Sequence, residues 1–273
     1  MDKWLIAADS SCDLPAEGPV AKAPFVISVG ARDYVDDELL DTEEMLSDME
    51  SCPEASHTSC PSPGVWLELF ELAENVIAVT ISQRLSGSCA SAATAREIYL
   101  ERHPGRRVLL INSRSTGPAL ALIVRRAREL ISSGADFAAL AEALPAYARS
   151  LRTAFALSSF TNLVKNGRMS RLTGFVANKL GVWGIGIGSE EGEIAVKSRL
   201  RGTVKALSAL VDDMGSNGFE GGEVCISHCF NPDAARTLRE KIELRWRDAR
   251  VHILETRGLC SYYAERRGLI LAY

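Results

Sequence analysis

The chain has 273 residues, of which 47% are hydrophobic and 24% charged, proportions typical of a globular protein with room for two cores. A net charge of −4 and the lack of any long basic block argue against nucleic acid as the main partner and against a polybasic membrane anchor. No apolar run approaches the length of a membrane span, and acidic residues occur too close to the N-terminus, at Asp2 and Asp9, for a signal peptide. We therefore expect a cytoplasmic protein without stable membrane insertion. The seven cysteines lack the spacing of a disulfide scaffold and are interpreted as reduced thiols.

The first half of the chain alternates apolar β-branched runs with segments of helical periodicity. Strands are predicted over 4–8, 24–29, 76–81 and 108–111, and helices from about 41, from Pro63 with Ser62 as its N-cap, and over 88–102, 117–132 and 136–150. A strand–helix alternation of this kind predicts an α/β domain with a mostly parallel sheet and right-handed crossovers.

After Arg152 the pattern changes to shorter strands joined by tight turns. A short helix over 160–169 ends in a glycine turn, strands are predicted over 183–188, 192–197, 223–227, 250–254 and 268–273, and helices over 202–214 and 232–245. These elements predict a second, smaller α+β domain, so the chain divides into domains 1–152 and 153–273.

A serine- and glycine-rich turn follows the apolar run Val76–Ile81 and leads into an alanine-rich helix. The turn, Ser82–Ala92, has hydroxyls at Ser86, Ser88 and Ser91, and Gly87 lets the backbone approach a ligand closely. Free N–H groups at a helix start attract negative charge, so we expect a carboxylate or a phosphate here. The alternative is a turn whose serines only cap the helix.

Two further polar loops are expected at the same edge of the sheet. The loop His57–Pro63 carries Thr58 and Ser59, and its two prolines exclude a regular helix or central strand. Ser10 lies in the turn that follows the first strand, where open parallel sheets carry their ligand crevice. The three loops therefore predict one shared pocket, although the turn that carries Ser10 is equally explained as a simple Asx or Ser turn.

Several separated motifs together resemble one family, the DegV family of bacterial fatty-acid-binding proteins. They are Asp9-Ser10-Ser11 with Asp13-Leu14-Pro15, Tyr34 with Asp36, Thr58-Ser59-Cys60-Pro61-Ser62-Pro63, Leu85-Ser86-Gly87-Ser88 with Ser91-Ala92, Gly167-Arg168, and Arg201 with Lys205-Ala206. The resemblance implies a non-catalytic lipid carrier with no cofactor or metal. One long-chain fatty acid such as palmitate would lie between an N-terminal α/β domain and a smaller second domain.

The resemblance also implies which residues bind the acid. Thr58 and Ser86 match the positions whose hydroxyls hold the carboxylate, with Ser59 and Ser10 bordering the same pocket and Gly87 and Ser88 contributing backbone. Arg168 and Arg201 match basic positions at the mouth, where a fatty-acid kinase phosphorylates the bound acid to an acyl-phosphate.

The chain departs from the family pattern at three places. Asn166-Gly167-Arg168 stands where the family has Gly-Gly-Arg, and residues 183–188 lack a Lys-Pro pair. Tyr263-Ala264-Glu265-Arg266-Arg267 stands where the family has His-Thr-Gly-Pro-Gly, so a phenol replaces a histidine and a charged turn replaces a flexible one. We therefore expect an intact lipid-binding half and a lost or altered partnership with a kinase.

Other functions remain as alternatives at this point. A serine-dependent acyl hydrolase would use Ser86 or Ser88 as nucleophile and His57 as base, but no Gly-x-Ser-x-Gly elbow occurs. A phosphate-ester-binding protein would use the same serine loop, without the lysine of a P-loop. A zinc site at Cys225–Cys229 is disfavoured because His228 would face the opposite side of a strand from both cysteines, and no second pair with ligand spacing occurs.

Overall fold

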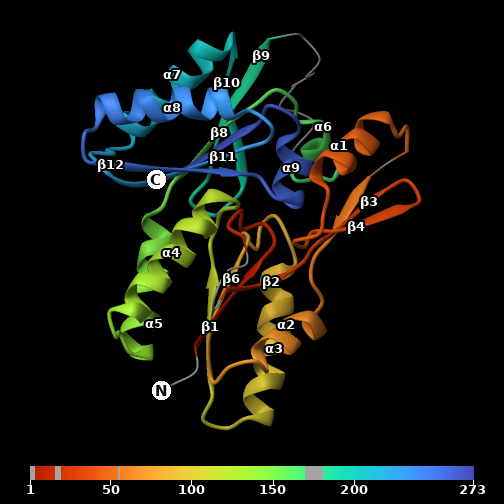
Figure 1. Cartoon of the computed structure of the whole chain (residues 1–273), viewed down its shortest axis with the longest axis vertical. Helices are drawn as coiled ribbons and strands as arrows, with labels where there is room; N and C mark the ends of the chain where they lie inside the picture. The colour runs from red at the N-terminus through yellow and green to blue at the C-terminus, as the bar shows by residue number, and fades with distance from the viewer. Residues whose placement is uncertain (1–3, 16–19, 55, 170–180) are drawn as a thin grey trace.

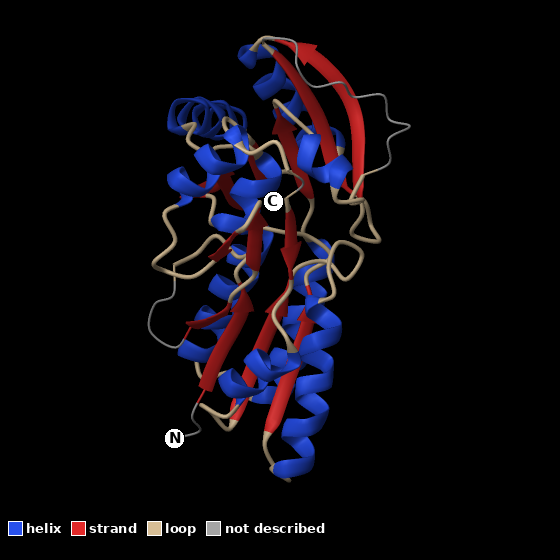
Figure 2. Ribbon diagram, turned by 90° about the vertical axis from the view of Figure 1, so that its right-hand side faces the viewer, coloured by secondary structure: helices blue, strands red, loops and turns tan. Residues whose placement is uncertain are grey.

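The computed structural model describes residues 4–15, 20–54, 56–169 and 181–273. Four strands form a parallel sheet in the order β2-β1-β6-β7, from β1 (Trp4–Asp9), β2 (Val20–Ala23), β6 (Asn75–Thr80) and β7 (Arg107–Asn112). Every residue of β6 is buried, which explains its continuous apolar run. The strands lie in the lower part of Figure 2, and their carboxyl ends point toward the rest of the molecule.

Four helices cover the two faces of this sheet. On one face α2 (Pro63–Phe70) and α3 (Ser88–Arg102) bury Trp66, Phe70 and Tyr99 against the strands. On the other face lie α4 (Pro118–Ser132) and α5 (Phe137–Ser150) (Figure 1). Ser62 caps α2 as predicted, with its Oγ accepting from the Val65 N–H at 3.4 Å.

A second, antiparallel sheet of three short strands lies beside the first, in the order β4-β3-β5. It contains β3 (Val26–Val29), β4 (Arg32–Val35) and β5 (His57–Ser59), with α1 (Thr42–Ser51) between the last two in sequence. The prediction of one strand over 24–29 was therefore incomplete. Val20–Ala23 joins the parallel sheet and Val26–Val29 begins a hairpin, whose reversal Gly30 makes at φ +57°.

The remaining strands form one six-stranded sheet in the order β10-β9-β8-β13-β11-β12. They are β8 (Thr153–Leu157), β9 (Val182–Gly188), β10 (Ile194–Arg201), β11 (Gly222–His228), β12 (Ala249–Glu255) and β13 (Leu269–Ala272), antiparallel except for β11 and β12. The helices α7 (Thr203–Ser216) and α8 (Pro232–Arg245) cover one face, as the top of Figure 1 shows. The predicted fold class, α/β with a second α+β part, is confirmed.

Helix α4 packs between the two large sheets. Its residues Pro118–Val124 are all buried, and its cluster includes Ile77 of the parallel sheet together with Cys225 and Ala272 of the six-stranded sheet. A helix with apolar neighbours on both sides needs apolar residues almost all round, which accounts for its sequence. The domain boundary between residues 152 and 153 stays a prediction.

Two short helices complete the part of the chain that the structure describes. They are α6 (Thr161–Lys165), which was predicted as a longer helix over 160–169, and α9 (Gly258–Ala264), which was not predicted. Both lie where the six-stranded sheet faces α1 (Figure 1). None of the described helices is long and apolar enough to cross a membrane.

Candidate functional site: a cavity between the sheets

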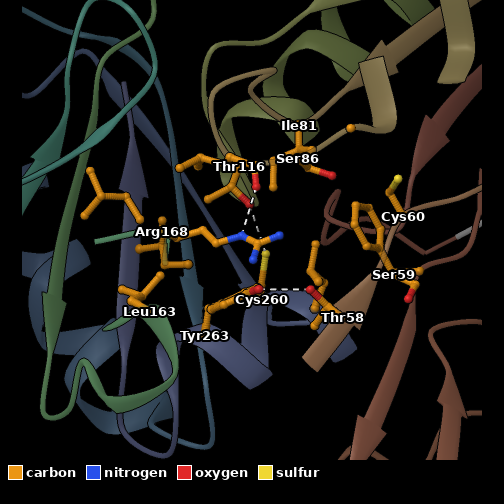
Figure 3. A pocket seen from close by; sticks show the side chains of 16 residues that line it. Thr58, Ser59, Cys60, Ile81, Ser86, Thr116, Leu163, Arg168, Cys260 and Tyr263 are labelled. Carbon is orange, nitrogen blue, oxygen red and sulfur yellow. Dashed lines mark hydrogen bonds between the residues drawn. The ribbon is translucent and has the colours of Figure 1, made fainter. Parts of the chain in front are cut away.

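A cavity of about 370 Å³ lies between the carboxyl edge of the parallel sheet and the six-stranded sheet (Figure 3). Its wall comes from the β5 loop, the β6–α3 loop, the segment after α6, and α9, with single residues from β10 and β13. The lining residues are Phe25, Thr58, Ser59, Cys60, Ile81, Leu85, Ser86, Gly87, Thr116, Leu163, Arg168, Ile194, Leu259, Cys260, Tyr263 and Ile270. Five predicted site residues are thus brought together: Thr58, Ser59, Ser86, Gly87 and Arg168.

The β6–α3 loop presents one serine to the cavity and turns another away from it. Ser86 lines the cavity, and its Oγ accepts from the Ser88 N–H at 3.2 Å. A Cβ on Gly87 would lie 3.3 Å from Cys60 Sγ, so glycine lets the two hydroxyl loops come close together. The Ser88 Oγ, by contrast, is buried and donates to Asp9 Oδ2 at 2.7 Å.

The turn after β1 also supports the loop rather than lining the cavity. Asp9 is fully buried, and its Oδ2 accepts from the Ile81 N–H at 2.8 Å as well as from Ser88. Burial raises the pKa of Asp9, while hydrogen bonds from Ser11, Ile81 and Ser88 act in the opposite direction. The Ser10 Oγ accepts from the Phe25 N–H at 2.9 Å. Ser88 and Asp9 therefore hold the loop that carries Ser86, whereas Ser10 holds the backbone at Phe25.

Tyr263 reaches the cavity from α9 and meets Thr58. Their hydroxyl oxygens lie 2.9 Å apart, as the dashed line in Figure 3 shows. Burial raises the pKa of Tyr263, so the phenol keeps its proton and can donate at neutral pH. Tyr263, which the resemblance places where the family has a histidine, therefore lies inside the cavity itself, beside a residue expected to bind the carboxylate. The sequence analysis singled out residue 263 but not this contact, because α9 was not predicted.

Arg168 is the one charged side chain among the lining residues. Its Nε donates to the Leu85 carbonyl at 3.1 Å and its Nη1 to the Asn166 carbonyl at 2.5 Å. Figure 3 shows its guanidinium between the hydroxyl loops and α9. Arg201, also predicted at the mouth, ends β10 in an exposed position and does not line this cavity.

The cavity continues into a smaller apolar space of about 70 Å³. Leu85, Thr116, Leu163, Ile194, Tyr263 and Ile270 line both spaces. Phe155 and Leu157 of the six-stranded sheet extend the wall beyond them. The whole cavity is polar and cationic at one end and apolar at the other, which suits a ligand with an anionic head and a hydrocarbon tail.

The geometry gives little support to an acyl hydrolase. Thr58 is half-buried and faces α9, whereas the neighbouring His57 is exposed and does not line the cavity. Side chains of adjacent strand residues point to opposite faces, so a histidine beside Thr58 is not placed as a base for Ser86. Among the described residues, no group of three or more His, Cys, Asp or Glu side chains could hold a metal ion.

These features define a protein with an amphipathic ligand cavity between two sheets, and comparison with known proteins gives its family. The chain belongs to the DegV family, because the model of that family, described as uncharacterised proteins, matches residues 3–270. A DegV domain-containing protein of Streptococcus pneumoniae is 38% identical over 276 aligned residues, covering 99% of this chain and 98% of that protein.

Solved structures agree with this assignment. The S. pneumoniae Fatty Acid Kinase (Fak) B3 protein, loaded with linoleic acid, is 38% identical, with a TM-score of 0.95 and coverage of 99% of both chains. A DegV family protein from Eubacterium eligens loaded with heptadecanoic acid is 35% identical, with a TM-score of 0.95 and coverage of 98% of both. A Ruminococcus gnavus member refined with vaccenic acid is 27% identical, with a TM-score of 0.92 and coverage of 99% of both.

Proposed function

We propose that the protein binds one long-chain fatty acid, with the carboxylate held at the polar end of the cavity and the tail buried at its apolar end. The observation that carries the proposal is the arrangement of Thr58, Ser86 and Arg168 around one end of a cavity whose other end is lined mainly by apolar side chains. Relatives with 27% to 38% identity hold such acids, which supports the same ligand class here.

The physical roles of the two ends differ. Hydroxyl and backbone donors can satisfy a buried carboxylate, and the single guanidinium compensates its charge. Each buried methylene contributes about 0.8 kcal/mol, so a sixteen-carbon tail supplies on the order of 12 kcal/mol before ordering costs. The head therefore fixes orientation while the tail supplies most of the affinity, and the ligand should remain bound through purification.

Native mass spectrometry of the purified protein, followed by organic extraction, tests this proposal. We expect one long-chain fatty acid per chain, and at least a tenfold loss of palmitate affinity in the double variant Thr58→Ala, Ser86→Ala, because each removed hydrogen bond to a charged group contributes about 1.5 kcal/mol or more. The control is Thr94→Ala, an exposed hydroxyl on α3 that donates to the Ala90 carbonyl. A ligand-free protein with no affinity for added palmitate would contradict the proposal.

The carrier would present its acid to a fatty-acid kinase in the bacterial cytoplasm. A broad polar hollow of about 570 Å³ opens beside the mouth, lined in part by Arg84, Ser86, Asn166 and Arg168, so a second protein can reach the carboxylate end. The relation to the Fak B3 protein supports this step. The step requires that phosphoryl transfer to the bound acid proceeds with a phenol at residue 263; the alternative is a carrier whose partnership with a kinase has changed.

Incubation of palmitate-loaded protein with a fatty-acid kinase and ATP separates these outcomes. Acyl-phosphate formation with the natural chain would show that a histidine at residue 263 is dispensable. Formation only with Tyr263→His would mean that the natural chain is a carrier without this partnership, and would overturn kinase presentation while leaving lipid binding intact.

A further inference from the structure

A second hollow, of about 240 Å³, lies away from the mouth of the acyl cavity. It is lined by Ser113, Arg114, Ala148, Arg149, Leu151, Arg152, Gly188, Ser189 and Glu190. None of these residues lines the 370 Å³ cavity, and only Arg114 and Gly188 also line its apolar extension. The hollow is therefore a separate feature that shares one wall with the space at the tail end.

Three arginines from three different segments line this hollow. Arg114 comes from the loop after β7, Arg149 from the last turn of α5, and Arg152 from the connection to β8. Within the described residues, none of the three forms an ion pair with a carboxylate, whereas Arg32 and Arg266 each pair with carboxylates of α1. Arginines that outnumber the carboxylates of a concave site, here three against Glu190, with Glu191 near Arg114, are a usual arrangement for binding an oxyanion.

The loop that carries Arg114 is held in an unusual conformation. Arg114 has φ +54°, which is uncommon for a residue with a side chain, and its N–H donates to Asn112 Oδ1 at 3.1 Å. The loop follows the carboxyl end of β7, the edge at which open parallel sheets place their ligands. The Arg114 Nη2 also donates to the Arg149 carbonyl at 3.4 Å. This bond offsets the partial negative charge of the helix dipole at the C-terminus of α5, which lies beside the hollow.

We propose that this hollow binds a phosphoryl group. Three arginines against the single Glu190 give the lining a charge of about +2, which matches the −1.5 to −2 of a phosphate monoester near neutral pH. Ser113 and Ser189 also line the hollow, but their hydroxyl protons are already donated to the Ser115 carbonyl and to Glu191 Oε2, so the arginines are the groups that would hold the ligand. The site does not depend on what the acyl cavity holds, but its shared wall of Arg114 and Gly188 places a bound phosphoryl group next to the tail end of that cavity.

The probe for this site is inorganic phosphate, titrated into the full chain at constant ionic strength and followed by the line width of its ³¹P NMR signal. We expect saturable binding that weakens at least tenfold in the double variant Arg149→Gln, Arg152→Gln. The matched control is Arg102→Gln, an exposed arginine at the end of α3 that lies outside the hollow. Both substituted arginines are exposed, so the fold should be unaffected, and a circular dichroism melt checks this.

A second arm identifies the source of the phosphoryl group. Sedimentation with phosphatidylglycerol vesicles, against phosphatidylcholine vesicles, shows whether the double variant loses binding to an anionic lipid headgroup or only to soluble phosphate. Loss in either assay supports the site. Equal binding by the double variant and the natural chain in both assays would overturn it, as would phosphate binding that is lost in Arg84→Gln at the mouth and retained in the double variant.

Discussion

The two walls of the acyl cavity are both supported by buried aspartates from the start of the chain, but the supports are not equivalent. The β6–α3 loop rests on Asp9, both of whose oxygens are used: Oδ1 accepts from Ser11 Oγ at 2.5 Å, and Oδ2 from the Ile81 N–H and Ser88 Oγ. The loop that carries Ser86 is thus fixed by a fully satisfied carboxylate.

The opposite wall, α9, is supported at its N-terminus by two aspartates. Asp36 accepts from the Gly258 and Leu259 N–H groups, each at 2.8 Å, and Asp13 Oδ1 accepts from the Arg257 N–H at 2.9 Å. Asp13 Oδ2, however, is buried without a hydrogen-bond partner among the described residues, and burial raises the pKa of Asp13 to about 6. The comparison teaches that the carboxylate of Asp13, behind the wall carrying Tyr263, is less completely hydrogen-bonded than that of Asp9.

Asp9→Ala should produce the largest effect, because it removes the acceptor of four buried donors: the Ser11 N–H and Oγ, the Ile81 N–H and the Ser88 Oγ. Each unsatisfied donor costs about 1 to 3 kcal/mol, so the free energy of unfolding should fall by about 3 kcal/mol or more, as measured by urea denaturation. Asp33→Ala is the control, since the Asp33 carboxylate only accepts from Ser28 in an exposed hairpin. If Asp9→Ala lowers the free energy of unfolding by less than about 1 kcal/mol, the Asp9 carboxylate does not support its wall more strongly than Asp13 supports the other.

Asp13→Asn should change how stability depends on pH. The folded-state pKa of Asp13 lies above its unfolded value, so the folded state binds the proton more tightly, and this group's stabilising contribution is present below about pH 4 and lost as pH rises through about 6. The natural chain should therefore lose on the order of 2 kcal/mol between pH 4.5 and 7.5 that the variant does not lose.

Urea unfolding of both proteins at pH 4.5, 6 and 7.5 gives this difference directly. At pH 7.5 the variant should be at least as stable as the natural chain, because it no longer buries an unpaired charged oxygen. If the free energy of unfolding depends on pH in the same way in the natural chain and in Asp13→Asn, Asp13 does not titrate as proposed, and the two aspartate supports are equivalent in this respect.

The same two walls show how far sequence reasoning reaches. The β6–α3 side was predictable because its signals are local: an apolar run long enough for a buried strand, then Ser86 and Gly87 in a turn, then an alanine-rich helix. Whether a serine faces the ligand or a buried carboxylate is not a local property. Ser10 and Ser88 fit the pattern as well as Ser86 does, yet their hydroxyls serve the framework around Asp9 and Phe25.

The α9 side was not predictable for a related reason. Gly258–Ala264 is too short to show helical periodicity, and the carboxylates that bind its first N–H groups, Asp13 and Asp36, stand more than 200 residues earlier in the chain. Arg201 stays a prediction: a motif places it at the mouth, and in the structure it ends β10 in an exposed position without lining the cavity.

Tyr263→Phe tests the contact by which α9 reaches the other wall. It removes one hydroxyl beside Thr58 and leaves the ring in place, so palmitate affinity should fall about five-fold, the equivalent of one hydrogen bond of about 1 kcal/mol. Isothermal titration with delipidated protein measures it, and the unfolding midpoint should move little. An unchanged affinity would mean that Tyr263 only orients Thr58 and makes no contribution to ligand binding.

The smallest effect is expected at the turn that follows α9, where two residues with side chains adopt positive φ: Glu265 at +54° and Arg267 at +75°. Glycine relieves the backbone cost of about 1 kcal/mol at such a position, but Arg267→Gly also removes the contact of this guanidinium with the Trp183 ring, 5.1 Å from its centroid. Because the two contributions are similar and opposite, the free energy of unfolding should change by less than about 0.5 kcal/mol.

Arg267→Ala, which loses the ring contact and keeps the strained backbone, should be less stable than Arg267→Gly by about 1 kcal/mol. Equal stability of the two variants would show that this turn stores no strain, and that α9 is constrained only by the aspartates at its other end.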